Sequence, residues 1–266
     1  MNKKKCLVSI LILNYNNADF LNRSIKSCLD QSYKNIEILI FDDKSKDDSI
    51  LILKKYKSKK IKIINNKSKK TGIAAFDAKN GYYRLIKRSR GEIISLLDSD
   101  DHFKKNKILE IIKIFKNKKK INFVQNLPLI RFENKTEIKK NRNNPMSFWP
   151  YLAPESCISF RKNFIKRFFK KNYILKNNYN DVWLGFRLGV YAYFVDKSFY
   201  TLNKNLTFYK SYGESKKYRF LSLNWFKRRL NSYHYLKNIS KNNISLRLNL
   251  DYFFTKVFTI FLKTLK

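Results

Sequence analysis

Residues 93–101 read Ile-Ile-Ser-Leu-Leu-Asp-Ser-Asp-Asp: five apolar or small residues, then three carboxylates within four positions. A short apolar run between polar segments predicts a strand that is buried on both faces. Carboxylates this close together repel, and the repulsion raises their pKa values unless a cation neutralises them. In a chain of net charge +38, the acidic cluster therefore predicts a site for a hard divalent cation with oxygen ligands.

Similar apolar runs upstream alternate with segments of helical periodicity. Strands are expected at 7–13, 36–41, 61–64 and 93–97, and helices at 18–31, 47–56, within 72–90 and at 104–115. This βαβαβαβ order predicts an α/β fold with a mostly parallel central sheet and helices on both faces.

Polar clusters follow three of these expected strands, at residues 14–17, 42–43 and 98–101. In open α/β sheets, ligands bind beyond the carboxyl ends of the strands. Because the three clusters are expected at one edge of one sheet, they predict a shared binding site there.

The second half of the chain has a weaker pattern. Strands are expected at 121–125 and 156–160, helices at 163–169 and 180–191, and a mobile polar loop at 131–147. From about residue 206 the chain is aromatic and basic, and it ends in an apolar helical stretch at 250–265.

The bulk composition leaves several partners open. Lys and Arg number 58 against 20 Asp and Glu, which fits nucleic acid, an anionic membrane surface or an acidic substrate, and equally a coding bias toward Lys, Asn and Ile. Three unpaired cysteines suit a reducing compartment. No secretory leader is evident, and no run approaches the roughly 20 apolar residues of a spanning helix. A cytoplasmic location is expected.

Several motifs together resemble a known family. They are Val8-Ser9-Ile10-Leu11-Ile12-Leu13-Asn14-Tyr15-Asn16, Gln31-Ser32-Tyr33-Lys34-Asn35-Ile36-Glu37-Ile38, Asp42-Asp43-Lys44-Ser45-Lys46-Asp47, Gly91-Glu92-Ile93-Ile94 and Asp98-Ser99-Asp100-Asp101. In this order and spacing, over residues 7–115, the chain resembles glycosyltransferase family 2, whose members have the GT-A fold. The resemblance implies inverting transfer of a sugar from a nucleotide-diphospho-sugar donor, usually with Mn²⁺ or Mg²⁺.

The resemblance also assigns donor-side roles. Tyr15 would pack against the donor base, Asp43 would hydrogen-bond it, and Asp98 would lie near the ribose or the metal. Asp100 would ligate the metal that bridges the diphosphate. The full set implied for the nucleotide-sugar is Leu13, Tyr15, Asn16, Asp43, Asp98 and Ser99, with Asp98 and Asp100 on the metal. The structural alternatives are a core Tyr15, a turn or cap role for Asp43 and a solvated turn at 98–101.

Inverting transfer needs a base opposite the leaving group. The family usually supplies it from a Glu-Asp pair at the start of a helix, and Asn180-Asp181 stands at the matching place. Asp181 is the expected base, with a helix N-terminal role as the alternative. Glu155 is a second candidate, and Trp183 is either an acceptor-pocket or a core residue. Which basic residue meets the diphosphate stays open, because Lys79 and Arg84 match the family only loosely.

The resemblance implies three segments: residues 1–125 as the nucleotide-sugar-binding half of a GT-A domain, 126–205 as its acceptor-binding half, and 206–266 as a C-terminal helical extension. The expected acceptor is a glycan or a lipid-linked sugar in bacterial surface polysaccharide or lipopolysaccharide synthesis. Residues 250–265 would either lie in the interface of the cytoplasmic membrane or close the core. The alternatives are a basic nucleic-acid-binding protein and a nucleotidyltransferase on a related fold.

Overall fold

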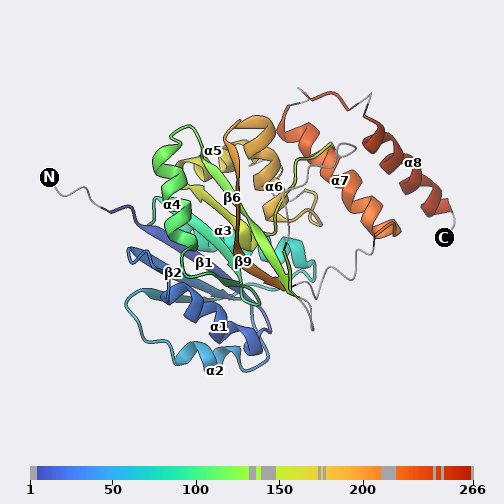
Figure 1. Ribbon diagram of the computed structural model, residues 1–266. Helices are drawn as coiled ribbons and strands as arrows, with labels where there is room; N and C mark the ends of the chain where they lie inside the picture. Colours follow the sequence, from blue (N-terminus) through green and yellow to red (C-terminus); the bar gives the residue numbers. More distant parts are fainter. Residues whose placement is uncertain are drawn as a thin grey trace.

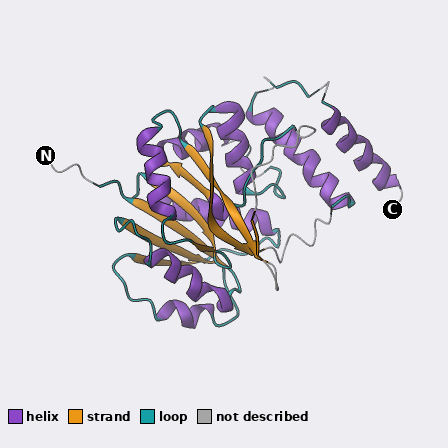
Figure 2. Cartoon of the chain, viewed as in Figure 1, coloured by secondary structure: helices purple, strands orange, loops and turns teal. Residues whose placement is uncertain are grey.

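The computed structural model describes residues 5–131, 136–138, 148–172, 175, 178–210, 220–241, 244–246 and 249–264. Within these ranges, nine strands form one sheet with helices on both faces (Figures 1 and 2). The strands are β1 (Val8–Asn14), β2 (Ile36–Asp42), β3 (Ile61–Asn65), β4 (Ile93–Asp98), β5 (His102–Phe103), β6 (Phe123–Arg131), β7 (Thr136–Ile138), β8 (Ile158–Arg161) and β9 (Phe199–Lys210). The helices are α1 (Ala18–Leu29), α2 (Ser49–Lys54), α3 (Ala74–Arg88), α4 (Lys107–Asn117), α5 (Lys162–Asn172), α6 (Leu184–Val190), α7 (Leu223–Ile239) and α8 (Leu250–Thr264), with a 3-10 turn η1 (Glu155–Cys157) and a π-helical segment η2 (Tyr191–Val195).

The strand order is β3-β2-β1-β4-β8-β6-β9-β5, with β7 paired to β6. The strands β3, β2, β1 and β4 are all parallel, as the βαβ order predicted. Strand β8 joins β4 and β6 antiparallel, and β9 lies parallel to β6. The first half of the sheet is therefore parallel and the whole sheet is mixed.

The apolar strands are buried on both faces because helices cover both. In β1, Val8, Ile10 and Ile12 face a core shared with α1 and α4, while Leu11 faces a second core shared with α3, α5, α6 and α7. Alternate side chains of a strand point to opposite faces, so both cores need apolar residues from the same run. The predicted α/β architecture is confirmed.

Some expected elements differ from the structure. The helix expected over 180–191 begins only at Leu184, because carbonyls of the preceding turn accept hydrogen bonds from the Arg187 side chain. The expected strand at 156–160 starts at Ile158, after η1. Within the expected loop 131–147, residues 136–138 form β7, and 139–147 lie outside the described residues.

Two long strands join the expected segments of the chain. Strand β6 runs across the expected boundary at 125, and β9 runs across the one at 205. One continuous sheet therefore connects all three segments, and the division of labour among them stays a prediction.

Helices α7 and α8 form the C-terminal extension beside the sheet layer, with α8 outside α7 (Figure 1). No described helix has the length and apolarity needed to cross a membrane. The buried side chains of α8 are Thr255 and Thr259, whereas its phenylalanines are exposed. Its Phe258 and Tyr252 rings contact Phe226 and Tyr233 of α7, so both alternatives for residues 250–265, a membrane-interface helix and a helix that closes the core, stay predictions.

Candidate active site

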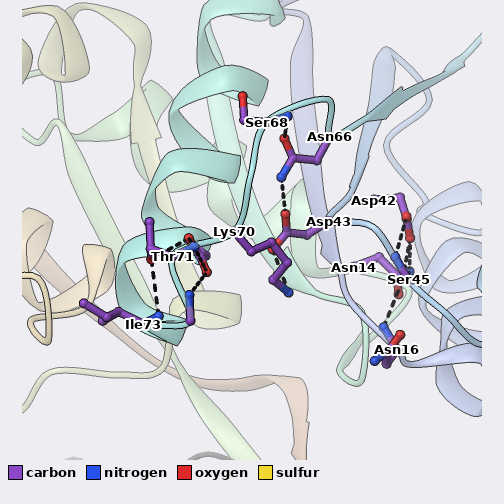
Figure 3. Close-up of polar contacts among 12 residues, drawn as sticks. Asn14, Asn16, Asp42, Asp43, Ser45, Asn66, Ser68, Lys70, Thr71 and Ile73 are labelled. Carbon is purple, nitrogen blue, oxygen red and sulfur yellow. Dashed lines mark hydrogen bonds and ion pairs between the residues drawn. The ribbon is translucent and has the colours of Figure 1, made fainter.

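The site is built at the carboxyl ends of three neighbouring parallel strands. In the sheet register, Asn14 of β1 lies opposite Asp42 of β2, and Leu13 of β1 lies opposite Asp98 of β4. The Asn14 side-chain amide donates to Asp42 Oδ1 at 2.8 Å, which fixes the two strand ends together (Figure 3). The residues after each strand consequently emerge at one edge.

A cavity of about 800 Å³ opens at this edge, large enough for a nucleotide-sugar. Residues come to it from β1, β4, β9, α3, α6, α7 and the connecting loops. Its lining comprises Leu13, Tyr15, Asn17, Asp43, Lys70, Gly72, Ala74, Asp77, Ala78, Asp98, Ser99, Asp100, Ala153, Pro154, Glu155, Trp183, Gly185, Phe186, Tyr209, Lys210 and Arg228.

Three lining residues lie together, since Lys70 contacts both Tyr15 and Asp43. Its ammonium lies 3.1 Å from Asp43 Oδ2 and 2.9 Å from the centre of the Tyr15 ring. Asn66 donates to Asp43 Oδ1 at 2.5 Å, so both carboxylate oxygens are engaged (Figure 3). Tyr15 is 45% exposed, which rules out the alternative of a core tyrosine.

The acidic cluster contributes Asp98 and Asp100 to the lining of the cavity. Tyr82 OH donates to Asp98 Oδ1 at 2.7 Å, and the Asp98 backbone N–H donates to Ser156 Oγ at 2.9 Å. Burial and the neighbouring Asp100 raise the pKa of Asp98 to about 7, and burial also raises the pKa of Asp100. Negative charge is thus held here at an electrostatic cost that a bound cation would remove.

Asp101 is fully buried behind the cluster. Its Oδ1 accepts the backbone N–H of Lys210 at 2.8 Å, while no described residue donates to its Oδ2. Burial, with repulsion from Asp100 and Asp98, raises the pKa of this carboxyl well above its usual range. Burial and repulsion thus favour the neutral form of Asp101.

The acidic residues fit a cation that shares its coordination with a ligand. Among the described residues, no group of three His, Cys, Asp or Glu side chains is arranged to hold a metal alone. Mg²⁺ is typically held by one or two carboxylates together with substrate phosphates and water. Asp98 and Asp100, which both line the cavity, match this two-carboxylate pattern.

Glu155 and Trp183 also line the cavity, from the side of α6. Glu155 Oε1 accepts the backbone N–H of Gly185 at 2.6 Å, and a Cβ at Gly185 would lie 2.7 Å from Glu155 Cγ. Only glycine at position 185 lets the start of α6 come this close to the Glu155 side chain. Burial and the nearby Asp98 raise the pKa of Glu155 to about 8.

The described part of the chain places Asp181 and Asn16 outside the residues that line the cavity. Asp181 lies in the turn before α6. Both of its carboxylate oxygens accept hydrogen bonds at 3.0 Å from the side-chain amide of Asn231 in α7. Asn16 has a positive φ of 49° and braces the loop after β2, since its Oδ1 accepts from Lys46 N–H at 2.7 Å.

Comparison with known proteins gives the family. A sequence model described as "Glycosyl transferase family 2" matches residues 9–230, more than half of the chain. This chain belongs to glycosyltransferase family 2. The sequence-based resemblance to glycosyltransferase family 2 is confirmed.

Individual relatives match this family 2 chain over different lengths. It is 28% identical over 222 residues to an uncharacterised glycosyltransferase of Nostoc sp., covering 77% of this chain and 65% of that protein. It is 38% identical over 113 residues to the UDP-Glc:alpha-D-GlcNAc-diphosphoundecaprenol beta-1,3-glucosyltransferase WfaP of Escherichia coli, covering 42% of this chain and 43% of WfaP. The matches thus span less than two thirds of these curated relatives.

The family 2 chain also resembles a solved structure. S. aureus TarS 1-349 in complex with UDP-GlcNAc superposes with a TM-score of 0.63, over 96% of this chain and 71% of that one. At 14% identity this likeness shows the fold alone. It agrees with the GT-A fold that the resemblance implied.

Three cavity residues carried no usable sequence signal. Lys70, Lys210 and Arg228 bring positive charge to the cavity from the loop before α3, the end of β9 and α7. They are 3 of 58 basic residues, so composition could not single them out. Lys210 lies close enough to Asp100 to counteract part of the rise in its pKa.

Arg187 fixes the turn that carries Asp181. Its fully buried guanidinium donates to the carbonyls of Val182, Leu175, Asn178 and Tyr179 at 2.5–3.2 Å. Four carbonyls thus converge on one side chain and are paired away from water. The Arg187 guanidinium thus supplies the hydrogen bonds that these carbonyls would otherwise receive within a helix or a strand.

We expect Arg187→Met to lower the free energy of unfolding by about 3 kcal/mol or more, because it leaves several buried carbonyls without donors. Urea unfolding followed by circular dichroism measures the loss. The control is Arg88→Met, which removes an exposed arginine and is expected to change stability by less than about 0.5 kcal/mol. Equal stability of the two variants would contradict the role of Arg187.

Proposed function

We propose that this chain transfers a sugar from a nucleotide-diphospho-sugar to a hydroxyl of a lipid-linked or other glycan acceptor, with inversion at the anomeric carbon. The observation that carries the proposal is one cavity lined by Tyr15, Asp43, Asp98 and Asp100, where the expected base-binding and diphosphate-binding residues meet. The name of WfaP, a glucosyltransferase that uses UDP-Glc and a diphosphoundecaprenol-linked sugar, supports both substrate classes. Synthesis of a bacterial surface polysaccharide at the cytoplasmic face of the membrane is the proposed setting.

On the donor side, the Tyr15 ring packs on the nucleobase and Asp43 accepts a hydrogen bond from it. Lys70 now covers the Tyr15 ring and pairs with Asp43. A base that stacks on that face of the ring must therefore replace the Lys70 ammonium, which then becomes free to contact the ligand. Leu13 and Ser99 also line the cavity and complete the proposed donor-binding set.

The diphosphate lies over Asp98 and Asp100. When bound there, Mn²⁺ or Mg²⁺ neutralises the charge that builds on the diphosphate as the glycosidic bond breaks. Asp98 is oriented for this role by Tyr82 OH and by its backbone bond to Ser156 Oγ. Lys210, beside Asp100, supplies a second positive charge to the leaving group.

On the acceptor side, we propose Asp181 as the base that takes the proton of the attacking hydroxyl. Its support is the position of Asn180-Asp181 just before α6, two residues ahead of Trp183, which lines the cavity. Reaching an acceptor requires the Asp181 carboxylate to leave Asn231. Glu155 lies within the cavity already and is the alternative base, and its bond to Gly185 N–H also positions the start of α6.

A donor screen tests this function. Purified protein is mixed with Mn²⁺, a series of nucleotide-sugars and GlcNAc-diphosphoundecaprenol, and release of nucleoside diphosphate is measured. The expected result is release that depends on one donor, on the acceptor and on the metal. Absence of release with every donor tested, or equal release after EDTA treatment, would contradict the proposal.

Lys210→Met should lower kcat by roughly 10- to 100-fold, because the charge that Lys210 stabilises develops in the transition state. Lys204→Met is the matched control: it lies on the same strand, and its ammonium pairs with Glu110 outside the cavity. Nucleoside diphosphate release at saturating donor gives kcat for both variants. Similar kcat values would remove Lys210 from the diphosphate site.

A further inference from the structure

Helix α8 carries its apolar side chains on the outside of the molecule. The α8 stripe, defined here as Leu250, Phe253, Phe254, Val257, Ile260 and Phe261, follows helical spacing along one side. These side chains are 43–68% exposed, and no described residue covers them. Isolated exposed apolar residues are ordinary, but a continuous stripe of this size marks an interaction surface.

The orientation of α8 is fixed by its contacts with α7. Thr255 and Thr259, each 2% exposed, face inward, and Asp251 pairs with Arg229 of α7. The Phe258 and Phe226 rings stack at 5.4 Å. These contacts hold the side of α8 that carries Asp251, Thr255, Phe258 and Thr259 against the molecule, so the stripe on the other side faces outward.

We propose that the α8 stripe is a docking surface for an anionic lipid membrane. The helix combines phenylalanine and leucine on one side with Lys256 and Lys263, both exposed and seven residues apart, on its flank. Helices of this composition lie in the membrane interface, with the apolar side among the acyl chains and lysines at the headgroups. The net charge of +38 attracts anionic lipid.

Charge also argues against a second copy of the chain as the occupant. Two molecules that each carry +38 repel as their surfaces approach, and the α8 stripe offers no acidic residues to offset this. An anionic membrane gains from the same charge that opposes self-association.

The docking surface extends the proposed function. Its role, which is to bring the enzyme to a lipid-linked acceptor, rests on that function. The packed rings of Phe226, Trp225 and Phe220 continue from Phe258 toward the start of α7. The same helix contributes Arg228 to the cavity. Helix α7 therefore connects a lipid-facing surface to the site where a sugar linked to a membrane lipid would have to arrive.

Vesicle flotation of the full chain tests the surface. The probes are vesicles of phosphatidylcholine alone and of phosphatidylcholine mixed with phosphatidylglycerol.

The double variant Phe254→Gln, Phe261→Gln is compared with a control double variant, Leu51→Gln, Ile138→Gln, which removes two exposed aliphatic residues from α2 and β7. We expect the wild type and the control to float with anionic vesicles, and the α8 variant to lose at least about tenfold in affinity. The variant Lys256→Gln, Lys263→Gln should bind anionic vesicles with an affinity lower by about fivefold per lysine. Its affinity for vesicles of phosphatidylcholine alone should equal that of the wild type.

Two outcomes would overturn the proposal: a wild type that does not float, or an α8 variant that floats as well as the control. A dimer seen by light scattering that dissociates only in the α8 variant, without flotation, would assign the stripe to self-association instead. Transfer to a water-soluble acceptor analogue should be equal in all variants. If neither the wild type nor any variant transfers sugar, the proposed function is wrong. The flotation result still shows whether the α8 stripe binds membranes.

Discussion

Asp100→Asn is expected to lower sugar transfer by roughly 10³-fold or more, because the substitution removes a carboxylate that holds the cation on the leaving diphosphate. The amide keeps the size of the side chain, so the cavity retains its shape. Release of nucleoside diphosphate with Mn²⁺ present measures the effect, and Asp19→Asn, an exposed carboxylate on α1, is the control.

The same substitution should not destabilise the metal-free protein. Burial raises the pKa of Asp100, so its charged form costs stability once the pH exceeds the carboxyl pKa of the unfolded chain. Replacing it by a neutral amide also removes the repulsion from Asp100 that raises the pKa of Asp98. In EDTA near pH 7 the Tm of Asp100→Asn should equal or exceed that of the wild type. A lower Tm together with lost activity would mean that the carboxylate serves folding.

Asp181→Asn is expected to lower kcat by about 10²- to 10⁴-fold, since no group then accepts the acceptor proton. Donor binding should persist, because Asp181 lies outside the residues that line the cavity. Calorimetric titration with the nucleoside diphosphate and Mn²⁺ measures binding, and acceptor-dependent turnover measures the chemistry.

Glu155→Gln serves as the paired variant. The amide can still accept the Gly185 N–H, so the start of α6 should remain in place. If Asp181 is the base, Glu155→Gln keeps most of its turnover. Near-normal turnover of Asp181→Asn with loss in Glu155→Gln would transfer the role of base to Glu155.

The parallel half of the fold could be predicted directly from local sequence. β1, β2 and β4 are predominantly apolar because both of their faces are buried, and such runs are visible without any knowledge of the tertiary structure. β9 was missed because its twelve residues are unevenly buried and its place depends on pairing with β6, more than 60 positions away. Its position is a property of the assembled sheet.

Helix α8 shows the same limit. Its apolar spacing predicted a helix over 250–265, and α8 covers Leu250–Thr264. The direction in which the stripe faces depends on the contacts of Asp251 and Phe258 with α7 and on the burial of Thr255. Periodicity gives the faces of a helix, and only the packing shows which one is turned outward.

Most of the candidate site was predictable for a physical reason: neighbouring parallel strands end at the same edge of the sheet, so the residues after them meet there. Tyr15, Asp43 and Asp98 to Asp100 come after three such strands and line one cavity. Lys210 and Arg228 come from β9 and α7, where no motif signals their approach. The role of Asp181 depends on the acceptor and stays a prediction.

The central claim is that Asp98 and Asp100 hold a divalent cation on the diphosphate of a donor bound in this cavity. The most direct measurement is anomalous X-ray scattering from a crystal soaked with Mn²⁺ and a nucleoside diphosphate. We predict a manganese peak at about 2.0–2.4 Å from oxygens of Asp100 or Asp98 and of both phosphates. A nucleotide bound elsewhere, or bound in this cavity with both carboxylates free of manganese, would contradict it.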